Sequence, residues 1–515
     1  MIHQLLKLKL IRKKKLMRKN GVLLHVSSLP SPYGIGTLGQ SAYDFVDYLR
    51  EHKQSLWQLL PVCPTSYGDS PYASYSTFAG NPYFIDLDLL AKDGLLNQEE
   101  YADLDWEDQP DRVNYGKLYN NRFTVLKKAV DRFLKFPPEE YAEFCKENVD
   151  WLDDYALFMA LKDKNEGKPW MKWDEREKLY TPEKAIELQK ENHEAFEFYR
   201  VLQYLFYKQW NALHDYARAN GVEMIGDLPI YVAMDSVDVW SHPELFALDE
   251  DRNPVAVAGC PPDGFSADGQ LWGNPLYNWD YHKQTGFEWW TRRVSQILST
   301  FDILRIDHFR GFDSYYAIPA DATTAREGEW LEGPGAELFA VIESRLGRQP
   351  IIAEDLGFLT PSVKKMLETV GYPGMKILEF AFDARDASSS DYLPYKYPAN
   401  SVAYVGTHDN DTAAGWLDSA NPEDVELAME FMNSSSRNMF HWDMIRTLLA
   451  SPADTTIVQA QDLLGLGSDC RMNTPSTVGC NWTWRLLPGQ LDETAGRKLQ
   501  RLTELYGRAV EAPGR

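Results

Sequence analysis

The sequence predicts an α/β fold, a (β/α)8 TIM barrel in which eight parallel strands alternate with helices. Two observations lead to this prediction. Short apolar runs of strand length recur eight times along the 515 residues, and segments with apolar residues at helical spacing separate many of them. Several of the runs are continuously apolar, as strands buried on both faces should be.

The eight expected strands follow one another along the chain. They are residues 21–26, 55–60 and 222–227, the runs that lead into Asp307 and Glu354, residues 375–380, the run that leads into Asp409, and residues 455–460. In a barrel of this class, chemistry takes place at the C-terminal ends of the strands. Three acids at such ends therefore mark the expected site.

The gap between the second and third expected strands is far too long for one crossover helix. Apolar residues recur at helical spacing near 117–135, 138–163 and 182–219, and Pro182 stands where a first helical residue would, after Thr181. We therefore expect a mostly helical subdomain inserted at about 62–220.

A second insertion, at about 235–280, is expected to be an active-site loop region. Residues 241–278 are rich in Pro, Gly and Asp, and a loop of this length is usually functional or disordered. Its aromatic residues favour an ordered loop that binds a ligand.

The first 20 residues carry eight Lys or Arg side chains, interleaved with or preceded by leucines. A secretory signal places its charges before the apolar region, so this pattern argues against one. We expect a basic extension that is disordered, or non-native if Met17 is the natural start; a membrane-surface helix is the alternative. Residues 21–515 would then form the catalytic barrel.

Composition excludes several classes of protein. Hydrophobic content of 44% and charged content of 25% are typical of a soluble globular protein. The net charge of −23 argues against nucleic acid or an anionic membrane as a partner, and no apolar run reaches membrane length. Five scattered cysteines without metal-type spacing suggest a reducing, cytoplasmic compartment. We expect no metal, no cofactor and no obligate protein partner.

The stretch from Leu304 to Gly311 turns from an apolar run into charged residues within a few positions. On an extended strand, residues two apart face the same side, so Arg305 and Asp307 should lie together. The cation is expected to lower the pKa of Asp307 and keep it ionised, as a nucleophile requires. A purely structural Arg–Asp pair is the alternative.

Two other strands share this pattern. Their runs end at Glu354 and Asp409, so Asp307, Glu354 and Asp409 should meet in one pit at the barrel edge. Like charges crowded there push pKa values apart, and one acid can stay protonated while another is ionised. A carboxylic acid beside a carboxylate is the equipment for cleaving a glycosidic bond.

At this point the residues resemble a known family. Arg305-Ile306-Asp307-His308, Ala353-Glu354-Asp355-Leu356-Gly357 and Thr407-His408-Asp409-Asn410 look like strand-end motifs of the α-amylase clan. Further stretches are similar to the 4-α-glucanotransferase family (amylomaltase, or disproportionating enzyme): residues 70–83, 226–232, 269–275, 471–475 and 481–485. Together the motifs are specific, and they span the chain from about Gly21 to Arg485.

The resemblance implies transfer of α-1,4-glucan segments between maltooligosaccharides, in a barrel without a separate C-terminal β-domain. It implies Asp307 as nucleophile, Glu354 as general acid/base and Asp409 as transition-state stabiliser. It also implies substrate-binding residues: Arg305, His308, His408, Asp227, Tyr72, Phe265, Gln270, Trp272 and Asn274. Two departures, Ser476 where the family usually has Gly and Cys63 before Pro64, concern the shape of loops.

Alternatives stay open for individual residues and for the function. His308 and His408 could be structural, Asp227 could cap a helix, and Trp272 could be a core residue. A plain α-glucan hydrolase would use the same three acids. A non-catalytic glucan-binding protein would lack one of them, and a metal-dependent hydrolase would show an HxH or HExxH pattern, which is absent from the sequence.

Overall fold

The computed structural model describes residues 18–262, 268–357, 359–385 and 389–510. At its centre, parallel strands close into a barrel in the order β1-β12-β11-β10-β9-β6-β3-β2. The strands are β1 (Lys19–Leu23), β2 (Leu56–Gln58), β3 (Glu223–Pro229), β6 (Ile303–Asp307), β9 (Ile351–Ala353), β10 (Gly374–Ile377), β11 (Ser401–Tyr404) and β12 (Thr455–Gln459). All eight expected runs contribute a strand, and the predicted barrel is confirmed.

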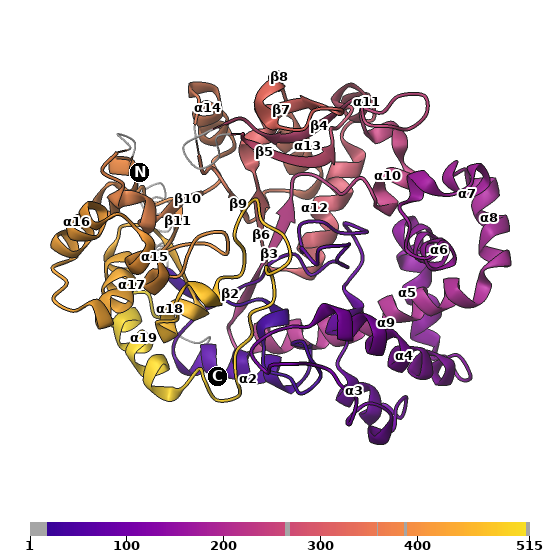
Figure 1. Cartoon of the computed structure of the whole chain (residues 1–515), viewed down its shortest axis with the longest axis horizontal. Coiled ribbons are helices and arrows are strands. Elements are labelled where there is room, and N and C mark those ends of the chain that lie inside the picture. Colours follow the sequence, from indigo (N-terminus) through magenta and orange to yellow (C-terminus); the bar gives the residue numbers. More distant parts are fainter. Residues whose placement is uncertain (1–17, 263–267, 358, 386–388, 511–515) are drawn as a thin grey trace, which may run out of the picture.

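Helices surround the barrel strands (Figure 1). They include α2 (Gln40–Glu51), α12 (Glu288–Thr300), α13 (Ala336–Leu346), α14 (Pro361–Val370), α15 (Ala413–Ser419), α16 (Pro422–Met432), α17 (Phe440–Ala450), α18 (Ala460–Leu464) and α19 (Glu493–Leu505). The expected sixth strand, 375–380, ends early: after Ile377 the chain continues as a 3-10 helix over Leu378–Phe382.

The first barrel strand begins earlier than the sequence suggested. Lys19 already pairs with Thr455, so β1 includes two residues assigned to the basic extension. Arg18 also belongs to the folded unit, because its guanidinium donates to the carbonyl oxygens of Tyr506 at 2.8 Å and Leu449 at 3.2 Å. The remainder of the expected extension, residues 1–17, lies outside the described residues.

The chain between β2 and β3 is mostly helical and forms the purple and magenta part of Figure 1. Asn114 caps α4 and Thr181 caps α8, whose first residue is Pro182. The helices are α3 (Leu87–Lys92), α4 (Tyr115–Phe133), α5 (Glu139–Glu147), α6 (Val149–Lys164), α7 (Glu175–Lys178), α8 (Pro182–Glu191) and α9 (His193–Ala219). The indole of Trp210 in α9 donates to the carbonyl oxygen of Thr300, which ties this insertion to the barrel.

A second, antiparallel sheet with the order β5-β4-β7-β8 stands beside the barrel. Its strands are β4 (Ala256–Cys260), β5 (Gln270–Pro275), β7 (Ser314–Pro319) and β8 (Glu329–Glu332), and short helices α10 (Val237–Ser241) and α11 (Trp279–Gln284) flank β4 and β5. The expectation of an irregular loop over 241–278 is therefore wrong for two stretches. β4 pairs with β7, a partner remote in sequence, so no local pattern reveals it.

Two further findings bear on the class of protein. None of the described helices is long and apolar enough to cross a membrane. After β12, the described chain contains α18, a 3-10 helix (Ser468–Cys470) and α19 but no named strand, consistent with the expected lack of a C-terminal β-domain.

Candidate active site

Arg305 is the central cation of the site at the C-terminal end of β6. Its side chain is only 3% exposed, and Nη1 donates to both carboxylate oxygens of Asp227, at 2.7 and 2.6 Å. Its Nη2 lies 3.0 Å from Oδ1 of Asp307. The register of β3 and β6 produces this arrangement because it pairs Asp227 with Arg305. The guanidinium therefore bridges two carboxylates from neighbouring strands.

Glu354 lies next to Asp307 because β6 and β9 are adjacent. Ile306 pairs with Ala353, and the backbone N–H of Glu354 donates to the carbonyl oxygen of Ile306 at 3.0 Å. The Glu354 carboxyl accepts two backbone N–H groups, from His308 at 2.7 Å and from Leu356 at 2.8 Å. Both oxygens of the side chain are thus held by the backbone, which fixes the orientation of the carboxyl group.

Asp409 follows β11 and shares its surroundings with an aromatic group. Nε2 of His408 lies 3.4 Å from Oδ2 of Asp409, and the His408 ring stacks on Tyr72 with 5.1 Å between centroids. The Tyr72 hydroxyl donates to Oδ2 of Asp227 at 2.7 Å. Tyr72 thereby connects the Asp227–Arg305 pair to His408, so the residues after β3, β6 and β11 form one site.

Trp482 completes this aromatic group, although the sequence analysis assigned it no role. Its ring lies 5.8 Å from that of Tyr72 and 6.0 Å from that of His408, and it is buried. Trp482 also has a φ of +65°, a left-handed conformation that bulky residues rarely adopt. Such strain is often found at functional sites, where the surroundings enforce it. The motif at 481–485 was the available signal.

Electrostatics in the pit differ from the sequence expectation. Burial raises the pKa of Asp307 well above its ordinary value, Arg305 opposes the rise, and Asp227, Glu354 and Asp409 add to it. The expectation that Arg305 sets a lowered pKa is therefore wrong in its net direction. The Asp307 side chain remains 26% exposed, so the rise reflects crowding by other groups as well as exclusion of water.

Glu354 shows the same direction of change. Burial raises its pKa, while Arg305 and the two backbone N–H donors oppose the rise. Two neighbouring carboxyl groups with raised pKa values favour a state in which one carries a proton and the other is ionised. That state is the one an acid and a nucleophile need.

The two histidines are buried and favour the neutral form. Burial lowers the pKa of His308 to about 3 and also lowers that of His408. Nε2 of His308 is buried and has no hydrogen-bond partner among the described residues. A neutral imidazole with a free nitrogen can bond a sugar hydroxyl, as the sequence analysis expected of these residues.

The predicted acceptor residues lie on β5 rather than on a loop. Trp272 is 37% exposed, so it is not a core residue, and its ring meets the ring of His308 edge-on at 4.9 Å. Its indole N–H donates to Oε1 of Gln270 at 3.0 Å. The Asn274 amide donates to the carbonyl oxygen of Val232 at 2.8 Å and holds β5 in place. Phe265 lies outside the described residues.

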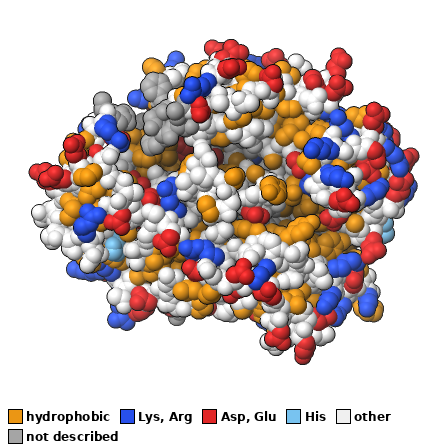
Figure 2. Space-filling model, in the orientation of Figure 1, with side chains coloured by type: hydrophobic (Ala, Val, Ile, Leu, Met, Phe, Trp, Pro, Cys, Tyr) orange, Lys and Arg blue, Asp and Glu red, His pale blue; other side chains and the backbone are white. Residues whose placement is uncertain are grey.

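Other open readings are also resolved. The Asp227 carboxylate bonds Arg305 and Tyr72 and does not serve as a helix cap. Ser476, which replaces a usual glycine, has a φ of +64°, so this loop keeps a glycine-type backbone. Cys63 contacts the carbonyl oxygen of Thr77 at 3.9 Å. Figure 2 shows this face of the molecule hollowed near its centre, with hydrophobic side chains bordering the hollow.

Comparisons with known proteins agree with this arrangement. The family model described as 4-alpha-glucanotransferase matches residues 24–490. A 4-alpha-glucanotransferase of Clostridium butyricum is 46% identical, over 94% of this chain and 100% of its own length, and one of Thermus thermophilus is 45% identical over 95% and 99%.

A solved structure shows the same fold at similar identity. The amylomaltase from Streptococcus agalactiae, in complex with acarbose, superimposes with a TM-score of 0.93 at 44% identity, covering 96% of this chain and 100% of that one. The amylomaltase from Corynebacterium glutamicum shares the fold at 18% identity, with a TM-score of 0.76. The chain belongs to the 4-alpha-glucanotransferase family.

Proposed function

We propose that the protein transfers α-1,4-glucan segments from a maltooligosaccharide, starch or glycogen chain to the 4-hydroxyl of an acceptor glucan or glucose. The reaction retains the α configuration through a covalent glucosyl-enzyme on Asp307. The observation that carries this proposal is the placement of Asp307 and Glu354 at the ends of adjacent strands, in register through the Ile306–Ala353 pair. Strands so paired lie about 4.8 Å apart, which suits the carboxyl separation of about 5–5.5 Å in retaining enzymes.

The first half of the reaction forms the covalent ester. The Asp307 carboxylate attacks the anomeric carbon, the bond from that carbon to the glycosidic oxygen breaks, and Glu354 gives its proton to the departing oxygen. Arg305 favours negative charge on Asp307 because its full positive charge lies 3.0 Å away. Glu354 is held by neutral N–H donors, so the shared proton is better placed on Glu354.

The second half regenerates the enzyme. Glu354, now ionised, takes the proton from the acceptor hydroxyl as that oxygen attacks the anomeric carbon, and the bond to Asp307 breaks. Two displacements at one carbon leave its configuration unchanged. Asp409 stabilises the positive charge that develops on the sugar ring. Arg305, Asp227, Tyr72, His308 and His408 hold the attacked sugar through hydroxyl contacts and ring packing.

Hydrolysis by the same acids is the second candidate function. The two reactions differ in whether water or a sugar hydroxyl takes the glucosyl group from Asp307. The antiparallel sheet favours transfer, because β5 holds the half-exposed ring of Trp272 against His308, beside the Glu354 carboxyl that activates the acceptor. An aromatic acceptor platform keeps a sugar hydroxyl at the site in competition with water.

Incubation with maltotriose tests the proposed transfer directly. We expect longer maltooligosaccharides and free glucose to accumulate together with little gain in total reducing ends, because each broken bond is replaced by a new one. Chromatography of the products and a reducing-end assay measure both quantities. A rise in reducing ends without elongation would show that the enzyme is a hydrolase.

Trp272→Ala is expected to shift the reaction toward hydrolysis. Losing an aromatic contact of about 1 kcal/mol on the acceptor side should raise the hydrolysis-to-transfer ratio about fivefold, while the first cleavage changes less. Product analysis with maltotriose measures the ratio. Leu271→Ala is the matched control, because the adjacent side chain on β5 is similarly exposed, at 42%, but points to the other face of the strand. An unchanged ratio in Trp272→Ala would remove it from the acceptor site.

A chelator is expected to leave activity intact. Among the described residues, no group of three or more His, Cys, Asp or Glu side chains could hold a metal ion. The comparison is the rate of maltotriose conversion before and after dialysis against the chelator. A loss of rate that a divalent ion restores would contradict this expectation.

A further inference from the structure

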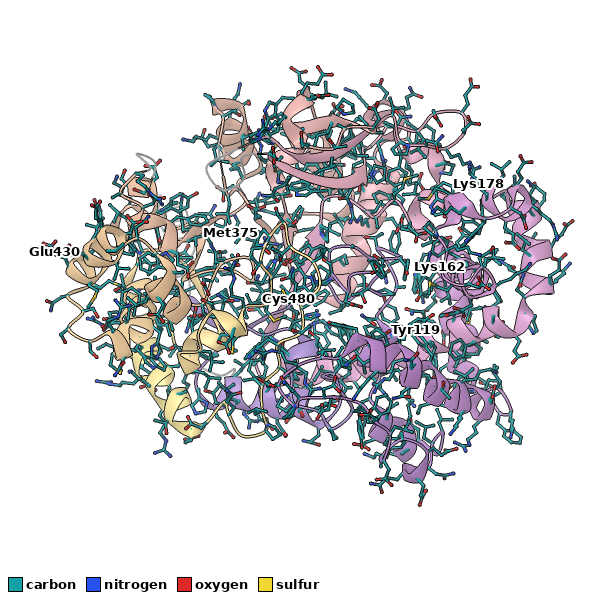
Figure 3. The ribbon with its side chains drawn as sticks, in the orientation of Figure 1. Tyr119, Lys162, Lys178, Met375, Glu430 and Cys480 are labelled. Carbon is teal, nitrogen blue, oxygen red and sulfur yellow. The ribbon has the colours of Figure 1, made fainter. Side chains whose placement is uncertain are left out.

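The segment between α18 and α19 crosses the middle of the molecule in Figure 1, and Figure 3 labels Cys480 on it near the centre of the view. This segment contains Asn473 and Arg471, to which the proposed mechanism assigns no role. We propose that Asn473 is a positioning residue that orients the carboxylate of Asp409 and that Arg471 supports it from behind. The inference rests on the proposed function, in which Asp409 stabilises charge on the sugar.

Asn473 reaches Asp409 by a direct hydrogen bond. Its side-chain Nδ2 donates to Oδ1 of Asp409 at 2.7 Å, across 64 positions of sequence. Its backbone N–H donates to the carbonyl oxygen of His408 at 3.2 Å, so both ends of Asn473 bind the turn after β11. The Asp409 side chain is otherwise open, with 44% of its surface exposed. A side chain this exposed needs such a bond to keep one rotamer.

Arg471 joins the same two segments by their backbones. Its Nη2 donates to the carbonyl oxygen of Asp409 at 2.8 Å, and its Nε donates to that of Asn473 at 3.3 Å. Its Nη1 lies 3.8 Å from Oδ2 of Asp411, which also accepts a hydrogen bond from Ser468 at 2.7 Å. Arg471 therefore fixes the distance between Asn473 and Asp409.

The chemistry of an amide suits this role. A carboxylate that stabilises positive charge must stay ionised and must point at the sugar ring. A lysine or arginine at position 473 would orient Asp409 but would neutralise part of its charge. The neutral amide of Asn473 orients it without that loss. His408 occupies the other oxygen and is itself neutral, because burial lowers its pKa.

The decisive variant is Asn473→Asp, which keeps the shape of the side chain but replaces the donor by a negative oxygen. At pH 7 we expect kcat for maltotriose to fall about 100-fold, with KM changed less than about threefold, because a misplaced catalytic group costs about that much. As pH falls, the introduced carboxyl gains a proton and can donate, so the ratio of variant to wild-type kcat should rise. The charged or titratable groups that face it are Asp409, Arg471 and His408.

Asn481→Asp is the matched control. Asn481 lies in the same segment and accepts the N–H of Thr474 at 3.0 Å, but makes no bond to Asp409. It should keep kcat within about threefold, and the ratio to wild type should not rise as pH falls. A change in Asn473→Asp that Asn481→Asp reproduces would show a general effect on the loop and overturn the inference.

A double-mutant cycle separates positioning from direct sugar binding. With a glucosyl fluoride donor, Asn473→Ala should lower kcat in the wild-type background but change it less than about twofold in Asp409→Asn, since the group it orients is gone. An equal loss in both backgrounds would overturn the inference, as would wild-type kcat in Asn473→Ala and Asn473→Asp. If Asp409→Asn itself keeps full activity, the proposed role of Asp409 fails, and the inference fails with it.

Discussion

Asp307→Asn is expected to lower turnover of maltotriose by at least about 10⁴-fold, because the amide cannot form the ester on which transfer depends. The fold should survive. Arg305 keeps its bidentate bond to Asp227, so the buried guanidinium is not left without a partner. Rate measurement and circular dichroism on the same preparation test both statements.

The same variant has an expected effect on stability with a defined sign. Because burial raises the pKa of Asp307, the native state at neutral pH holds this group at a cost that asparagine does not have. The melting temperature of Asp307→Asn at pH 7 should equal or exceed that of the wild type. As pH rises above about 4, the ordinary pKa of an aspartate, the wild type should lose stability relative to the variant. A large fall in melting temperature at pH 7 would show that Asp307 is needed for the fold.

Glu354→Gln is expected to lower kcat for maltotriose by about 10²- to 10⁴-fold, the usual contribution of a general acid/base. A glucosyl fluoride donor needs no proton on its leaving group, so formation of the covalent ester from it should be largely preserved. Asp307→Asn should remain inactive with both donors. Rapid-quench measurement of fluoride release separates the two roles, and equal losses with both donors would argue against Glu354 as the acid.

The pH profile gives an independent test of Glu354. The acid must be protonated in the first step, and its pKa is raised by burial. For the wild type, kcat/KM should therefore fall as pH rises through that raised pKa, and this alkaline limb should be absent when Glu354→Gln acts on the fluoride. Asp355→Asn is the control, because Asp355 is equally buried and its Oδ1 accepts the N–H of Met375 at 2.6 Å.

Stability measurements help to interpret the Glu354 variant. Both oxygens of Glu354 accept backbone N–H groups, whereas glutamine offers one oxygen. One of the two donors then loses its acceptor, at about 1–3 kcal/mol. The melting temperature should fall accordingly, and the loss should be the same whichever sugar donor is used. Only the difference between donors reports on catalysis.

The barrel and the acids could be predicted from the sequence for local reasons. A strand buried on both faces requires a continuous apolar run, and the runs before Asp307, Glu354 and Asp409 satisfy that requirement within a few residues. Parallel strands then bring their C-terminal ends to one edge. The pairing of Arg305 with Asp307 followed from the two-residue repeat of a strand and is present at 3.0 Å.

The tertiary structure decided the features that depend on partners distant in sequence. The antiparallel sheet forms because β4 pairs with β7, and its Gly- and Pro-rich strands carry too little apolar pattern to be recognised alone. The net direction of the pKa of Asp307 depends on Asp227 and Asp409 as well as on Arg305, and crowding outweighs the single neighbour visible in the sequence. The bond from Asn473 to Asp409 spans 64 residues. Contacts of this kind follow from chain closure, which local residue patterns do not encode.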